Sequence, residues 1–168
     1  KAFTNSMKSF SDKWTLGSAK TVQWPSGIGA KGTSGVAARI KNTSGSIGYL
    51  SSSYINKRIQ TAAIENFSGE FLKPSIESGI KSLRSIDVEN IPTIQSPNPR
   101  GKGSYPISTL TWIWVYKSGY GKKLDNIKNT LNFLLSEEAN TKALKMGFIP
   151  LNKKLQAYAI TAIKNIGI

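Results

Sequence analysis

Apolar residues at the start of the chain recur with the spacing of an amphipathic helix. Phe3, Met7, Phe10 and Trp14 lie at i, i+4, i+7 and i+11, so they share one helix face. No N-cap residue, initiating methionine or signal segment comes before this stripe. The pattern predicts a helix that is already running at Phe3, and we expect that the chain was cut from a longer one.

Turn-forming and apolar stretches alternate over the next part of the chain. Residues 21–24 predict a short strand, and a glycine-rich loop follows it. The apolar positions in 36–40 predict a short helix that ends at the turn 42–45. Residues 46–50 predict another strand. Strand, helix and strand in this order predict a βαβ unit.

A second short helix is predicted after Pro74. Ser75 follows the proline, and the apolar residues Ile76, Ile80 and Leu83 have helical spacing.

A loop rich in proline and glycine comes before the strongest strand signal. No regular element can cross residues 96–103, so we place a boundary there, which divides the chain into 1–103 and 104–168. From 107 to 117 both sets of alternating side chains are apolar, which is typical of a buried strand. Alternatively, the row Trp112, Trp114 and Tyr116 could form a platform on which nucleic-acid bases stack.

The last third of the sequence predicts helices. Apolar positions of helical spacing run from 127 to 146, and Gly147 suits the position just after a helix C-terminus. Residues 148–151 predict an extended connector, and Asn152 is expected to cap a final helix. The apolar face of that helix comprises Leu155, Tyr158, Ala159, Ala162, Ile163 and Ile166.

Composition excludes most enzyme classes. The 168 residues include no cysteine and no histidine, which excludes disulfides, thiolate nucleophiles, Ser-His-Asp triads and the usual zinc sites. Only nine carboxylates are present, and Glu137 and Glu138, adjacent on a predicted helix, diverge by about 100°. They cannot form a paired general acid and base. We therefore expect no enzyme, no catalytic residue, no metal and no cofactor.

The net charge of +14 is compatible with a polyanionic partner. The lysines are scattered rather than grouped, and lysine outnumbers arginine, whereas specific readers of nucleic acid rely more on arginine. No nucleic acid is expected as a partner, but a basic module that binds a polyanion or nucleic acid stays an alternative.

The glycine-rich loop invites a test for phosphate binding. Gly27, Gly29 and Gly32 match the spacing G-x-G-x-x-G of dinucleotide-binding loops. That fingerprint also needs a carboxylate about 20 residues further on, and no Asp or Glu occurs between Asp12 and Glu65. A Walker loop needs Gly-Lys-Ser/Thr, and here lysine comes before glycine. A tight turn into a helix, with Thr33 or Ser34 as N-cap, is the simpler interpretation.

Four stretches in order carry a resemblance to a known family. They are "WPSGIGAKGTSGVAARI", "GSIGYLSSSYI", "YPISTLTWIWVYK" and "NFLLSEEANTKALKMGFIPL". Together they resemble the C-terminal half of the periplasmic phosphate-binding proteins of ABC transporters, the PstS type. The resemblance implies an α/β class II periplasmic-binding-protein fold of two lobes joined by hinge-crossing strands. Residues 1–103 would be the remainder of the second lobe, and 104–168 the crossing strand and the C-terminal helices that return to the first lobe.

The resemblance also implies a function and a location. It implies the substrate-binding component of a phosphate ABC transporter, which captures inorganic phosphate in the periplasm, or at the outer face of the membrane, and delivers it to permease subunits. The family's phosphate contacts lie in its first half, so no binding residue carries over to this chain. Lys31, Gly32, Thr33 and Ser34 are left as cleft-adjacent candidates, and apolar surface exposed by truncation could associate with another chain.

Overall fold

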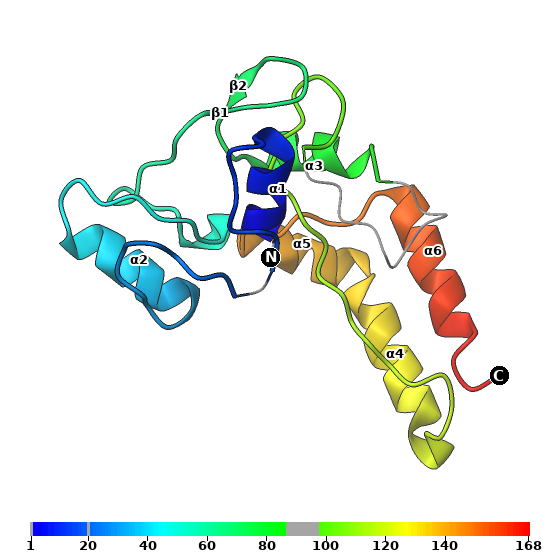
Figure 1. Cartoon of the computed structure of the whole chain (residues 1–168). Helices are drawn as coiled ribbons and strands as arrows, with labels where there is room; N and C mark the ends of the chain where they lie inside the picture. The colour runs from blue at the N-terminus through cyan, green and yellow to red at the C-terminus, as the bar shows by residue number, and fades with distance from the viewer. Residues whose placement is uncertain (1, 20, 87–97) are drawn as a thin grey trace. The chain divides into compact units, whose positions relative to one another are not determined.

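The computed structural model describes residues 2–19, 21–86 and 98–168, which are rich in helix and contain little sheet (Figure 1). The α-helices are α1 (Ala2–Phe10), α2 (Gly32–Asn42), α3 (Ile76–Leu83), α4 (Leu124–Leu134), α5 (Glu137–Lys145) and α6 (Lys153–Lys164). Two turns of 3₁₀-helix are η1 (Ser52–Tyr54) and η2 (Gly121–Lys123). The strands β1 (Ile64–Glu65) and β2 (Phe71–Leu72) pair antiparallel, with Ile64 opposite Leu72.

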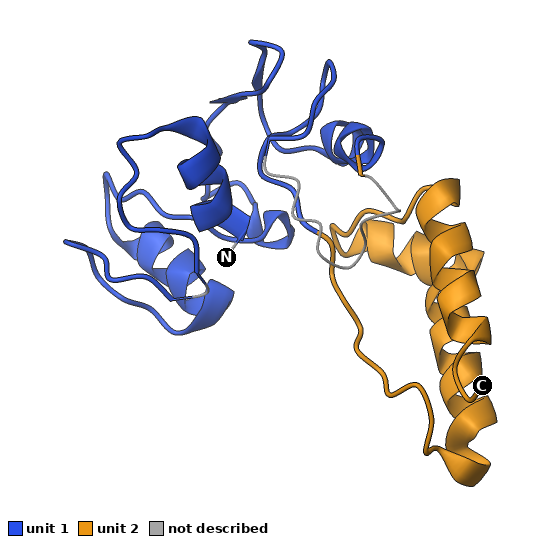
Figure 2. Cartoon of the chain, turned by 45° about the vertical axis from the view of Figure 1, so that its right-hand side comes forward, with its two compact units in different colours: residues 1–85, 95–109 blue, residues 86–94, 110–168 orange. Residues whose placement is uncertain are grey.

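The chain divides into two compact units (Figure 2). Unit 1 consists of residues 1–85 and 95–109, and unit 2 of residues 86–94 and 110–168. Unit 1 therefore contains α1, α2, α3 and the β1–β2 pair, and unit 2 contains α4, α5 and α6.

The predicted strands 21–24 and 46–50 are wrong, and so is the βαβ unit built from them. Neither segment is a strand in the structure. The segment around Gly48 lies against the side of α2 instead, so that a Cβ on Gly48 would come within 2.8 Å of Ile40 Cδ1. A strand requires a neighbouring backbone to pair with, and a helix offers none. The predicted helix between these segments is confirmed as α2.

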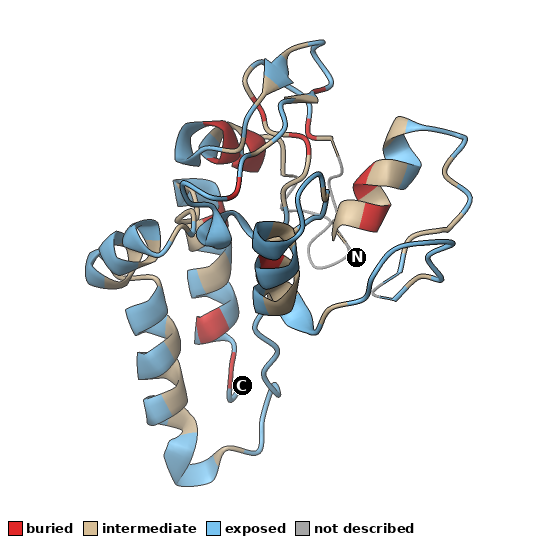
Figure 3. Cartoon of the chain, turned by 90° about the vertical axis from the view of Figure 1, so that its left-hand side faces the viewer, coloured by how far each residue is buried: buried red, intermediate tan, exposed pale blue. Residues whose placement is uncertain are grey.

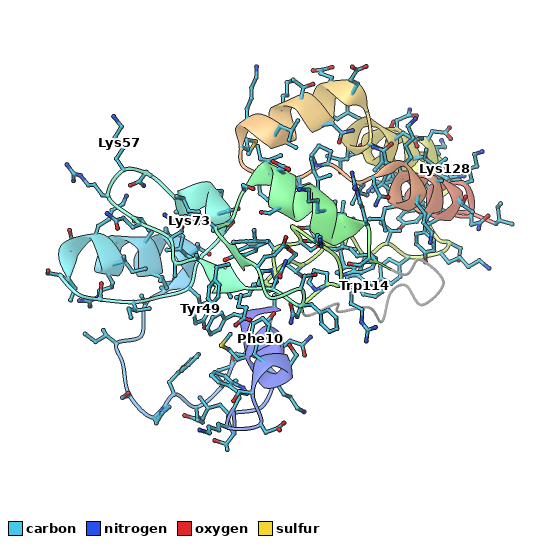
Figure 4. All side chains as sticks on the ribbon, turned by 90° about the horizontal axis from the view of Figure 1, so that it is seen from above. Phe10, Tyr49, Lys57, Lys73, Trp114 and Lys128 are labelled. Carbon is cyan, nitrogen blue, oxygen red and sulfur yellow. The ribbon has the colours of Figure 1, made fainter. Side chains whose placement is uncertain are left out.

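The predicted buried strand at 107–117 is also wrong for this structure. Among the described residues, no backbone hydrogen bond joins 111–116 to another segment. Side chains of both faces are exposed, including 57% of Ile113, 78% of Trp114 and 82% of Tyr116 (Figure 4). The apolar pattern describes burial between neighbouring strands. The described part of the chain places no such strand beside 111–116.

The helix α1 is held in unit 1 by an aromatic cluster of Phe3, Trp14, Trp24 and Tyr49. The Phe3 and Tyr49 rings stack with centroids 4.3 Å apart, and Figure 4 shows Tyr49 beside α1. Trp14 meets the rings of Phe3 and Trp24 edge to face. The predicted helix is thus confirmed up to Phe10, whereas Trp14 lies beyond its end and folds back onto it.

The prediction of a helix after Ser75 is confirmed as α3. The Ser75 hydroxyl accepts a hydrogen bond from the Ser78 backbone N–H, and the Ser78 hydroxyl accepts one from the Ser75 N–H, both at 3.0 Å. This reciprocal capping box satisfies two backbone donors that the helix itself cannot.

Replacing this cap should destabilise unit 1. We expect Ser75→Ala to lower the free energy of unfolding by about 1 kcal/mol, because the Ser78 N–H loses its acceptor at the helix start. Urea unfolding followed by circular dichroism measures the change. Ser51→Ala is the matched control, because Ser51 precedes η1 without any side-chain cap bond. Equal losses in both variants would contradict the assigned cap.

A turn centred on Asn66 fastens the β1–β2 pair to the loop 98–106. Asn66 is buried, and its side-chain oxygen accepts hydrogen bonds from the backbone N–H groups of Ser68 and Glu70. Its side-chain NH₂ donates to the Glu70 carboxylate and to the Ser104 carbonyl. The Gly103 N–H donates to the same carboxylate, and these hydrogen bonds hold the pKa of Glu70 below its usual range.

Residues 98–103 contain no regular element, as predicted, whereas the first two residues of that predicted loop, Ser96 and Pro97, lie outside the described residues.

The helices of unit 2 pack with a small core on α6. Leu155, Ile163 and Ile166 are among the few buried apolar residues of the described chain (Figure 3). α4 contacts α6, and Lys128 on α4 donates a hydrogen bond to the Lys164 carbonyl at the end of α6. The Asn152 cap is confirmed, since its side chain accepts from the Leu155 N–H at 2.9 Å.

The predicted helical run 127–146 is divided into α4 and α5. Ser136 causes the division, because its hydroxyl caps α5 by accepting a hydrogen bond from the Ala139 N–H. The predicted stop at Gly147 is confirmed. Gly147 has φ +80°, and the Phe148 N–H bonds back to the Ala143 carbonyl, as in a Schellman motif.

Candidate functional site

The glycine-rich loop leads directly into α2, which begins at Gly32. Lys31 is the N-cap residue in extended conformation, and it makes no side-chain cap bond. The prediction of Thr33 or Ser34 as N-cap is wrong, because both already lie in the first turn of the helix. Gly32 has φ +66°, a left-handed conformation that glycine adopts without strain, and this allows the helix to begin at once after the loop.

The first turn of α2 keeps the properties that attract anions. No acidic residue occurs in that turn, and no side chain caps its backbone N–H groups. Lys31, Gly32 and Ser34 are exposed, and Thr33 is half-buried. The partial positive charge of a helix N-terminus stabilises a nearby anion by about 0.3–1 kcal/mol when the site is exposed.

A shallow hollow of about 500 Å³ lies along one flank of α2. It is lined by Gly29, Ala30, Lys31, Gly35, Ala38, Arg39, Asn42 and Thr43. Of the four candidates, only Lys31 lines it. The lining side chains carry two positive charges, from Lys31 and Arg39, and no negative charge. The hollow therefore favours anions, but it is open to solvent, which screens those charges.

Sequence reasoning missed the contribution of Arg39, Asn42 and Thr43. The signal was present, because Gly35, Ala38 and Asn42 have the i, i+3, i+7 spacing of one helix face. Small residues along that face leave room for the hollow.

Metal and membrane chemistry find no support in the described residues. No group of three acidic side chains there could hold a metal ion. In the same part of the chain, no helix has both the length and the apolar character needed to cross a bilayer.

Comparison with known proteins gives the decisive observation. A PstS protein of Xylella fastidiosa (strain Temecula1), named Phosphate-binding protein PstS, is 30% identical over 173 residues, covering 96% of this chain. The PstS proteins of Methanocaldococcus jannaschii and Pasteurella multocida are 30% and 28% identical, covering 98% and 97% of it. This chain is similar to PstS proteins along almost its whole length. The resemblance expected from the four sequence stretches is thus confirmed, although no family model matches the chain.

The comparison also measures how much of a PstS protein the chain represents. The matched regions make up 47%, 48% and 50% of the three relatives, so the chain spans about half the length of the curated relatives it matches. These relatives are binding proteins by name rather than enzymes.

Proposed function

We propose that this chain is part of the substrate-binding component of a phosphate ABC transporter. In this role the intact protein captures inorganic phosphate outside the cytoplasmic membrane, in the periplasm or attached to the membrane surface, and delivers it to permease subunits. Similarity to PstS proteins over 96–98% of the chain carries the proposal. The lack of histidine and cysteine agrees with a binding role rather than catalysis.

The proposal includes a division of labour between two halves of a two-lobed protein. Residues 1–103 belong to the second lobe, and 104–168 supply the crossing strand and the helices that return to the first lobe. The main phosphate contacts come from the half that the match leaves out. Tight capture of an anion needs several charge-assisted bonds in an enclosed site. The open hollow beside α2, with Lys31 and Arg39, supplies an electropositive surface but no enclosure.

A joined protein tests this function. The region of the Xylella fastidiosa relative outside the match is placed before Lys1 of this chain, and phosphate binding is measured by calorimetry. We expect one phosphate per molecule with a dissociation constant below about 1 μM, equivalent to about −8 kcal/mol. Sulfate, in place of phosphate, is the control ligand. A joined protein that folds cooperatively and binds no phosphate would contradict the proposed function.

A polyanion-binding module is the second candidate function, favoured by the net charge of +14 and the basic hollow. It predicts that this chain binds duplex DNA with a steep dependence on salt, and that orthophosphate hardly competes. Under the phosphate-transport proposal, DNA binding by the chain is weak and shows no preference for the face that carries Lys31 and Arg39.

A further inference from the structure

Residues 111–116, called here the unpaired segment, combine exposed apolar side chains with unbonded backbone. Their sequence is Thr-Trp-Ile-Trp-Val-Tyr, and Ile113, Trp114, Val115 and Tyr116 are all exposed. At the end of the segment, the neighbouring residue Lys117 is fixed in unit 2, since its carbonyl accepts a hydrogen bond from the Gly167 N–H. The segment is thus anchored beside the helices of unit 2 while its own backbone groups stay unused.

The composition of the segment favours a β-strand as its partner. All six residues are β-branched or aromatic, and both faces are apolar, as in a strand from the centre of a sheet. Natural edge strands are protected by lysine, proline or bulges, and this segment contains no charge, proline or glycine. A lipid surface could accept the aromatic rings, but it would leave the backbone N–H and C=O groups without partners. A neighbouring strand satisfies both the backbone and the side chains.

We propose that residues 111–116 form an interaction surface that pairs with a β-strand from the half of a PstS-type protein outside this match. The inference rests on the proposed function for the identity of the partner. The length of the relatives supports this occupant, because about half of each lies outside the match. A second copy of this chain is the poorer occupant, since each copy carries a net charge of +14 and the two repel each other.

Amide hydrogen exchange tests the pairing in the joined protein described above. We expect exchange at 113–116 to be slower by at least about 100-fold in the joined protein than in this chain alone, because backbone N–H groups become hydrogen-bonded. Val115→Pro removes one N–H and should abolish that protection. Val115→Thr is the matched control, because threonine keeps both the N–H and the β-branched shape. In this chain alone both variants should melt within about 2 °C of the parent, because the Val115 N–H makes no bond there.

The outcomes separate this inference from the proposed function. Phosphate binding by the joined protein with fast exchange at 113–116 overturns the inference and leaves the function standing. Slow exchange without phosphate binding does the opposite. Protection that appears in this chain alone and rises with its concentration, together with a doubled mass in sedimentation, overturns the choice of occupant in favour of a second copy. A large loss of stability from Val115→Pro in this chain alone would show that the segment is already paired.

Discussion

Asn66→Ala should lower the free energy of unfolding by about 3 kcal/mol, because one side chain satisfies four polar groups. Its removal leaves two backbone N–H groups, the Ser104 carbonyl and one bond of the Glu70 carboxylate without partners. Each buried polar group left unpaired costs about 1–3 kcal/mol, and water reaching the opened turn recovers part of this. Urea unfolding followed by far-ultraviolet circular dichroism measures the loss.

A matched turn elsewhere in unit 1 gives the control. Asn56 also accepts a backbone hydrogen bond, from the Arg58 N–H, but it is exposed, so Asn56→Ala should cost less than about 1 kcal/mol. Asn66→Asp keeps the acceptor but replaces the donor with a charge facing Glu70, so it should be destabilising at pH 7 and less so as the pH falls toward 4. Similar losses for Asn66→Ala and Asn56→Ala would contradict the account of this turn.

Leu155→Ala should destabilise unit 2 by about 2–5 kcal/mol, because it removes the most buried apolar side chain of α6. Leu155 is 4% exposed, and the helices of unit 2 have few other buried apolar groups, so the cavity left behind cannot be filled easily. The same unfolding assay measures the change.

Ile160→Ala on the same helix is the control for Leu155→Ala. Ile160 is 41% exposed, so its truncation should cost less than about 1.5 kcal/mol while changing helix propensity in the same direction. A Leu155→Ala variant as stable as Ile160→Ala would mean that α6 does not carry the core of this unit.

The helices could be predicted from the sequence because their signals are local. The cap at Ser75, the cap at Asn152 and the stop at Gly147 each act within a few residues, and all three are found in the structure. The strands could not be predicted in the same way, because strand formation depends on a partner that a pattern does not identify. Residues 107–117 have the pattern of a buried strand and are nevertheless unpaired here. The short β1–β2 pair was missed because two residues are too few to show alternation.

The candidate site shows a similar limit. The position of Lys31 at the start of α2 follows from the loop and its glycines, and the structure places it beside the hollow. Arg39 comes into the same hollow only because α2 continues for two further turns on that flank. Function was predicted from resemblance rather than from site geometry, and the similarity to PstS proteins confirms the resemblance.

The central claim is that this chain is half of a phosphate-binding component and that the main phosphate contacts lie in the other half. Isothermal titration of the 168-residue chain with orthophosphate, at low and moderate salt, tests it most directly. The account predicts no heat at micromolar phosphate and at most weak, salt-sensitive binding in the millimolar range, which Lys31→Ala reduces further. Binding of one phosphate per chain with a dissociation constant below about 1 μM would contradict it, because this chain would then hold a complete site of its own.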